Sequence, residues 1–109
     1  METDHQVFKV IFAKKGQMRY ISHLDLLRLF GRAARRAGIP LILSKGFSPR
    51  PKISLKRALK LGLESEAEEG IFQVAAPSSR AAMTMEDFRD RLQAQLPEGI
   101  TIKNIEVIT

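Results

Sequence analysis

The side chains of this sequence best suited to chemistry are positively charged and lie in one central stretch. Between Asp25 and Glu64 there is no acidic residue, whereas ten arginines and lysines occur there. The stretch carries a charge of +10, against +1 for residues 1–25 and −5 from residue 64 onward. Clustered like charge raises the local potential and steers anionic partners toward it. The pattern predicts an anion-binding surface; the alternative is an ordinary solvated basic face.

Phosphate groups are the anions that we expect here. Arginine and lysine contacts to phosphates produce salt-dependent affinity for nucleic acid, and aromatic rings such as Phe47 and Tyr20 can stack on unpaired bases. RNA fits better than duplex DNA, because the sequence has no helix-turn-helix or zinc-finger motif. An alternative for Phe47 is a small apolar cluster beneath its loop. The predicted nucleic-acid-binding residues are Arg28, Arg32, Arg35, Lys45, Phe47, Arg50, Lys52, Lys56 and Arg57.

Three residues are candidates for acid–base catalysis. His23 carries an imidazole, which in its unperturbed state titrates at about pH 6.5. With Tyr20 and Lys52 it would form a metal-independent RNA-cleaving site. The competing interpretation, which we prefer, is that His23 begins a helix and forms a local hydrogen bond. We therefore expect no catalytic residues in this domain alone.

Composition limits the other possible classes of function. The sequence has no cysteine, which excludes disulfides, thiolate zinc sites and iron–sulfur ligation by this chain. His5, His23 and Asp25 lack metal-site spacing, so we expect no metal and no cofactor. No apolar run approaches the roughly 20 residues that cross a bilayer, and the N-terminus carries acids where a signal peptide carries bases. These features predict a cytoplasmic protein without a membrane partner.

The basic residues must be positioned by a helix and the loop that follows it. Ser22 and Asp25 resemble a capping box, which predicts a helix over residues 23–37 that ends before Gly38 and Pro40. The apolar stripe of this helix consists of Leu26, Leu29, Phe30, Ala33 and Ala37. The arginines at 28, 32 and 35 fall on the opposite side. Gly31 within the helix favours close packing of a neighbouring segment.

The loop after this helix carries the remaining bases. Pro49 and Pro51 restrict the backbone of the loop and so lower the entropy that is lost on binding. From Ile53 to Leu63, apolar residues occupy alternate positions, which predicts a strand over 53–63.

The other elements complete an α+β pattern. Residues 7–13, 71–76 and 100–108 read as strands, and residues 64–70 read as an acidic turn. Thr84 and Asp87 repeat the cap pattern before a second helix, whose apolar stripe consists of Met85, Phe88, Leu92 and Leu96. The order β-α-β-β-α-β predicts a ferredoxin-like sandwich: a four-stranded antiparallel sheet with two helices on one face, in a single domain of 109 residues.

Three motifs carry a resemblance to a known family. Arg19-Tyr-Ile-Ser-His-Leu-Asp-Leu, Arg32-Ala-Ala-Arg-Arg-Ala-Gly-Ile-Pro-Leu and Gly46-Phe-Ser-Pro-Arg-Pro-Lys-Ile-Ser resemble, in order and spacing, the radical-SAM-linked proteins. Ser48 stands where that family usually has asparagine. The resemblance implies a bacterial protein of undefined activity that works near radical-SAM enzymes, RNA processing and ribosomal proteins. It also implies that residues 1–109 are the N-terminal part of a longer family member.

The expected function is therefore a non-catalytic RNA-binding module that uses the basic helix and loop. Two alternatives remain open: an accessory domain that docks onto a radical-SAM partner protein, and an RNA-processing nuclease-like domain.

Overall fold

The predicted order of helices and strands is confirmed. The computed structural model describes residues 5–57, 61–75 and 83–108 of the chain. The elements are β1 (His5–Lys14), the 3₁₀ helix η1 (Gly16–Tyr20), α1 (His23–Arg36), β2 (Ile53–Leu55), β3 (Ser65–Ala75), α2 (Met85–Ala94) and β4 (Ile100–Val107).

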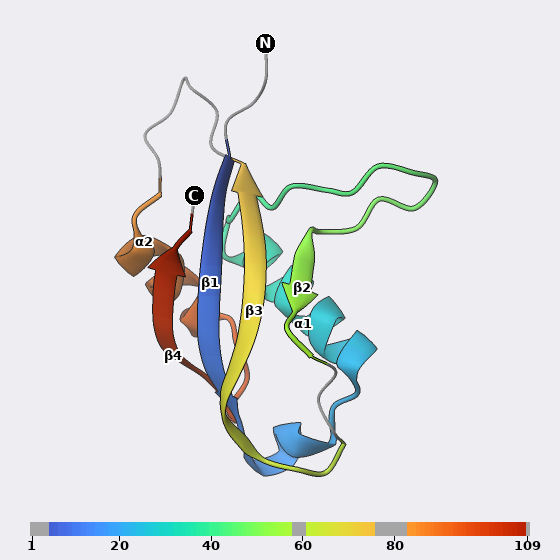
Figure 1. The fold of residues 1–109 in the computed structure, drawn as a ribbon, viewed down its shortest axis with the longest axis vertical. Helices are drawn as coiled ribbons and strands as arrows, with labels where there is room; N and C mark the ends of the chain where they lie inside the picture. Colours follow the sequence, from blue (N-terminus) through green and yellow to red (C-terminus); the bar gives the residue numbers. More distant parts are fainter. Residues whose placement is uncertain (1–4, 58–60, 76–82, 109) are drawn as a thin grey trace.

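The four strands form one antiparallel sheet in the order β2-β3-β1-β4. β3 therefore lies between β1 and β2, the two strands joined through α1. Both α-helices cover the same face of the sheet, and no helix of the described residues lies on the other face (Figure 1). This is the ferredoxin-like sandwich that the sequence predicted.

The core lies between the helices and the covered face of the sheet. Alternate residues of β1 point into it, because side chains along a strand alternate between the two faces. Phe8, Phe12, Phe30, Phe72 and Phe88 are all fully buried. Their rings pack in a chain, with centroid separations from 4.4 to 5.7 Å. Five of the six phenylalanines are thus used for packing.

Both predicted helix caps are present. The Ser22 hydroxyl accepts a hydrogen bond from the Asp25 amide at 3.1 Å, and the Thr84 hydroxyl accepts one from the Asp87 amide at 3.0 Å. These bonds satisfy amides that have no partner within the helix. On the predicted apolar stripe of α2, Phe88 and Leu92 are buried, whereas Met85 is 38% exposed and lies outside the core cluster.

The second strand and the acidic turn were predicted incorrectly. β2 ends at Leu55, and β3 already begins at Ser65. Leu61 and Leu63 are 64% and 56% exposed, and Leu59 lies outside the described residues. The acidic segment belongs to β3 because its backbone pairs with the second half of β1, in which Ile11 stands opposite Glu69. Tertiary pairing thus overrode the local alternation of leucines.

Candidate nucleic-acid interface

The segment between α1 and β2 forms a projecting arm, residues 42–52, which extends away from the body of the protein (Figure 1, green). Its two sides are joined by hydrogen bonds from the Ser44 amide to the Arg50 carbonyl and from the Lys52 amide to the Ile42 carbonyl, both 2.7 Å. The Arg50 amide also donates to the Ser44 hydroxyl at 3.1 Å. At its base, the Ile42 amide donates to the carbonyl of Gln73 in β3 at 2.9 Å. The base of the arm is therefore fixed to the sheet.

An open groove of about 470 Å³ runs between α1 and the base of the arm. We call it the α1–arm groove. Four arginines and an apolar set line it: Arg28, Arg32, Arg35 and Arg50, with Leu24, Leu27, Gly31, Pro51 and Ile53. A Cβ atom at Gly31 would lie 3.4 Å from Cγ of Pro51. This is an ordinary van der Waals distance, so helix and arm pack against each other at Gly31, as the sequence predicted.

Two further hollows adjoin the same helix. One, of about 640 Å³, lies between Gly38 and the arm and shares Gly31, Arg35 and Pro51 with the α1–arm groove. The other, of about 380 Å³, lies between α1 and the end of α2 and is lined by Arg32 and Arg36. The arginines of α1 therefore stand along a ridge with a concave surface on either side.

Most of these arginines have no carboxylate partner. Arg28 forms a 3.5 Å ion pair with Asp25, with both side chains exposed. The structure gives no ion pair to Arg32, Arg35, Arg36 or Arg50 among the residues that it describes. Exposed ion pairs such as Arg28–Asp25 contribute little free energy. Apart from Arg28, the arginines of the ridge therefore carry positive charge that no carboxylate of the described residues neutralises.

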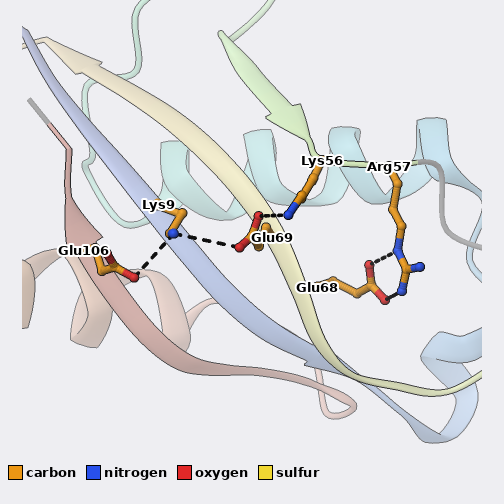
Figure 2. A network of polar contacts seen from close by, with 6 residues as sticks. All are labelled: Lys9, Lys56, Arg57, Glu68, Glu69 and Glu106. Atoms are coloured by element: carbon orange, nitrogen blue, oxygen red, sulfur yellow. Dashed lines mark hydrogen bonds and ion pairs between the residues drawn. The ribbon is translucent and has the colours of Figure 1, made fainter.

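Two of the predicted binding residues are instead neutralised by β3. Lys56 lies 3.2 Å from Glu69, and Arg57 donates two hydrogen bonds to Glu68, at 3.1 and 2.8 Å. Glu69 is also 3.8 Å from Lys9, which contacts Glu106 at 3.5 Å. Figure 2 shows these residues as two groups along the sheet. A phosphate would have to compete with carboxylates for Lys56 and Arg57.

Glu68 is a buried carboxylate on the covered side of the sheet. The Arg57 guanidinium, hydrogen-bonded to it, holds the pKa of Glu68 below its ordinary value of 4.5. A hydrogen bond from the Ser65 hydroxyl and the charge of the buried Lys14 also lower this pKa, while burial opposes the shift. The pairing therefore stabilises the ionised form of Glu68.

We expect this pairing to make stability depend on pH. Because the folded-state pKa of Glu68 is lowered, its contribution is complete above the unfolded-state value and is lost as pH falls through the folded-state value. The free energy of unfolding of the parent should therefore exceed that of Glu68→Gln most at neutral pH, and the difference should shrink below about pH 4. Urea unfolding of both proteins across this range tests it. A difference that stays constant with pH would contradict the role of the charge.

Lys52 lies on a different side of the molecule from the groove. Ile53 pairs with the buried Phe72, and the Gln73 amide donates to the Lys52 carbonyl at 3.1 Å. Lys52 directly precedes β2, and because neighbouring residues along an extended chain point to opposite faces, we expect its side chain on the open face with Gln73. Among the described residues, no strand residue of that face is aromatic, because the phenylalanines of β1 and β3 point inward. The open face therefore lacks the rings that would stack on bases.

The arm also carries the remaining two predicted residues. Lys45 and Phe47 occur in its outer turn, and both are exposed. Phe47 is the most exposed large apolar residue of the described chain, so the alternative of an apolar cluster beneath the loop was wrong. A fully exposed ring on a projecting arm is available for stacking.

The candidate acid–base residues do not line the α1–arm groove. The Tyr20 ring is occupied by Arg19, whose guanidinium carbon lies 4.5 Å from the ring centroid and whose Nη2 donates to the Tyr20 hydroxyl at 2.7 Å. Nδ1 of His23 is buried without a hydrogen-bond partner in the described part of the chain, so the local bond predicted for His23 is absent at this atom. Lys52 is also absent from the residues that line the groove. The structure therefore does not assemble Tyr20, His23 and Lys52 around this groove.

Within residues 5–57, 61–75 and 83–108, no group of three or more histidine or acidic side chains is arranged to hold a metal ion. None of the helices in these ranges is long and apolar enough to cross a membrane.

Sequence reasoning missed the apolar floor of the groove. Leu24 and Leu27 lie outside the stripe that faces the core, and Pro51 was read only as a stiffening residue. The sequence could have indicated this floor, because Leu24 and Leu27 fall on the same flank of α1 as Arg28 and Arg35. Only the packing of Gly31 against Pro51 brings these residues beside the arm.

Comparison with known proteins identifies a family without assigning a function. Residues 8–109 match the family model described as "Uncharacterized protein conserved in bacteria (DUF2344)". No curated protein matches the chain. The match covers nearly the whole sequence and includes β1 from Phe8 onward and all the later helices and strands. The chain therefore belongs to this uncharacterized bacterial family.

Proposed function

We propose that this protein is a non-catalytic module that binds single-stranded RNA through the α1–arm groove. Arg28, Arg32, Arg35 and Arg50 would contact phosphates, and Phe47 on the arm would stack on an unpaired base. In this proposal the module works beside radical-SAM enzymes or in RNA and ribosome processing, as the three motifs of the sequence imply.

The observation that carries this proposal is the unequal pairing of the basic residues. Lys9 and Lys56, on the open face of the sheet, and Arg57, beside the buried Glu68, are each paired with a glutamate. On the helix side, Arg32, Arg35 and Arg50 have no carboxylate partner within the described residues. The unpaired arginines favour binding of a polyanion on the helix side, because its phosphates displace only counterions there and do not compete with carboxylates of the protein.

The groove also suits an extended polymer better than a small anion. It is open, it continues past Arg35 into the hollow beside the arm, and the helix arginines follow one another along its wall. Arg28 and Arg32 are separated by about 6 Å along the helix axis. This separation is comparable with that of successive phosphates in an extended strand. A row of contacts of this kind supports RNA as the ligand.

Arg50 and Lys52 provide a test of the face that is used. Arg50→Ala should lower the slope of log affinity against log salt by about 0.7, the value for one phosphate contact on a single strand. Lys52→Ala removes the same charge on the open sheet face and should leave the slope unchanged. Fluorescence anisotropy with a labelled oligouridylate across a salt series measures both. Equal loss from the two variants would contradict the assignment of the site to the helix face.

Docking of an acidic protein surface, such as that of a radical-SAM partner, would use the same arginines. It predicts a different result in the same assay: no detectable affinity for oligouridylate even at low salt. Purified protein would then also lack the excess absorbance at 260 nm that bound RNA produces.

A further inference from the structure

We infer that the α1–arm groove contains a subsite for one unstacked nucleobase, on a floor formed by Leu24, Leu27, Pro51 and Ile53. The inference rests on the proposed RNA binding and goes beyond it, because a groove that held only phosphates would have no use for an apolar floor. It assigns the ligand class: single-stranded segments with exposed base faces, in preference to duplexes or to phosphate alone.

The composition of the groove supports a mixed ligand. Five of its nine lining residues carry no charged or polar side chain, and the other four are arginines. Its volume, about 470 Å³, falls in the range of roughly 300–1,000 Å³ typical of small-molecule sites. Such sites combine an apolar lining with a few polar groups that fix orientation. A nucleotide matches this combination, because it joins a flat base, which can contact an apolar floor, to a charged phosphate, which can contact arginines.

Leu24 is the floor residue whose apolar side chain a bound base would cover. It is 44% exposed, whereas Leu26 on the same helix is fully buried. Contact with a base would remove apolar surface from water, which is favourable in proportion to the area buried. Leu24 also lies outside the core cluster. The packing of the fold therefore leaves the Leu24 side chain uncovered, and a bound base could cover it.

The arginines of the walls fit the same ligand. A guanidinium is planar, forms forked hydrogen bonds to phosphate, and stacks on the faces of unpaired bases. Arg32 and Arg35 lack ion-pair partners among the described residues, so neither function is blocked by a carboxylate. A base-paired duplex presents its bases stacked and edge-on, which would leave the floor of the groove uncovered. The groove therefore favours unpaired nucleotides.

The experiment compares two probes of equal phosphate number: a short oligouridylate and an oligomer of the same length whose sugars carry no bases. The parent protein should bind the oligouridylate roughly tenfold more tightly or more, because each base that finds a face to contact adds affinity. The slopes against log salt should be equal, because both probes carry the same phosphates. This comparison requires no variant and so does not depend on the folding of one.

Leu24→Ser then locates the subsite. It should reduce affinity for oligouridylate about fivefold and leave affinity for the base-free oligomer and both salt slopes unchanged. Leu63→Ser is the matched control: Leu63 is 56% exposed and does not line the groove, so its replacement should change neither affinity. Thermal unfolding of both variants checks that they are folded.

Equal affinity of the parent for the two probes, or an equal effect of Leu24→Ser and Leu63→Ser, would overturn the base subsite while leaving phosphate binding intact. Failure of both probes to bind at low salt would instead overturn the proposed function itself.

Discussion

Replacing Arg32 and Arg35 together by alanine should weaken binding of single-stranded RNA roughly 60-fold near 50 mM salt and roughly tenfold near 200 mM salt. Each lost phosphate contact lowers the slope of log affinity against log salt by about 0.7, so the slope should fall by about 1.4. Both side chains line the α1–arm groove and lack ion-pair partners in the described part of the chain. The loss should be similar for oligonucleotides of different sequence, because phosphate contacts carry no base information.

The matched control is the double substitution of Arg89 and Arg91 by alanine on α2. It removes the same charge, but these arginines pair with Asp90 and Asp87, at 3.3 and 3.1 Å, and do not line the groove. The control should leave the slope close to that of the parent in the same anisotropy series. If both double variants lowered the slope equally, binding would reflect net charge alone, and the site on α1 would be refuted.

Replacing Phe30 by alanine should lower the free energy of unfolding by roughly 3 to 5 kcal/mol, the usual cost of removing a buried aromatic ring. Phe30 is fully buried and lies between Phe12 and Phe72 in the aromatic chain. Its ring packs edge-on against Phe12 and Phe72, at centroid distances of 5.1 and 5.3 Å. Removal would leave a cavity between α1 and the two central strands. Urea or thermal unfolding followed by circular dichroism measures the change.

The same substitution at Phe47 is its control. Phe47 is fully exposed on the arm, so Phe47→Ala should change the free energy of unfolding by no more than about 0.5 kcal/mol. A Phe30→Ala variant as stable as Phe47→Ala would contradict the packing of α1 on the sheet. Phe47→Ala should nevertheless weaken RNA binding if the ring stacks on a base. The pair therefore separates a packing role from a binding role for one residue type.

The elements predicted correctly from the sequence are those set by interactions between residues close together in the chain. Both helix starts were predicted, because a cap is a bond between residues three apart, as for Ser22 and Asp25. The second strand was misplaced, because alternation from Ile53 to Leu63 is a local pattern, whereas strand ends depend on pairing partners elsewhere. Ser65 joins β3 because it stands opposite Lys14 of β1. No local pattern contains that information.

Residue order alone establishes that the positive charge is concentrated between Asp25 and Glu64 and that Phe30 faces a core, because composition and helical period are properties of the chain. Which positive charges remain unpaired depends on the tertiary fold. The pairing of β2 and β3, which continues into a bond from the Lys56 amide to the Glu69 carbonyl at 2.9 Å, brings glutamates to Lys56 and Arg57. No strand brings acids to Arg32 and Arg35 in the same way. Two opposite charges neutralise each other only when they lie close in space. In this protein the strand register sets those distances, and they cannot be read from the order of residues.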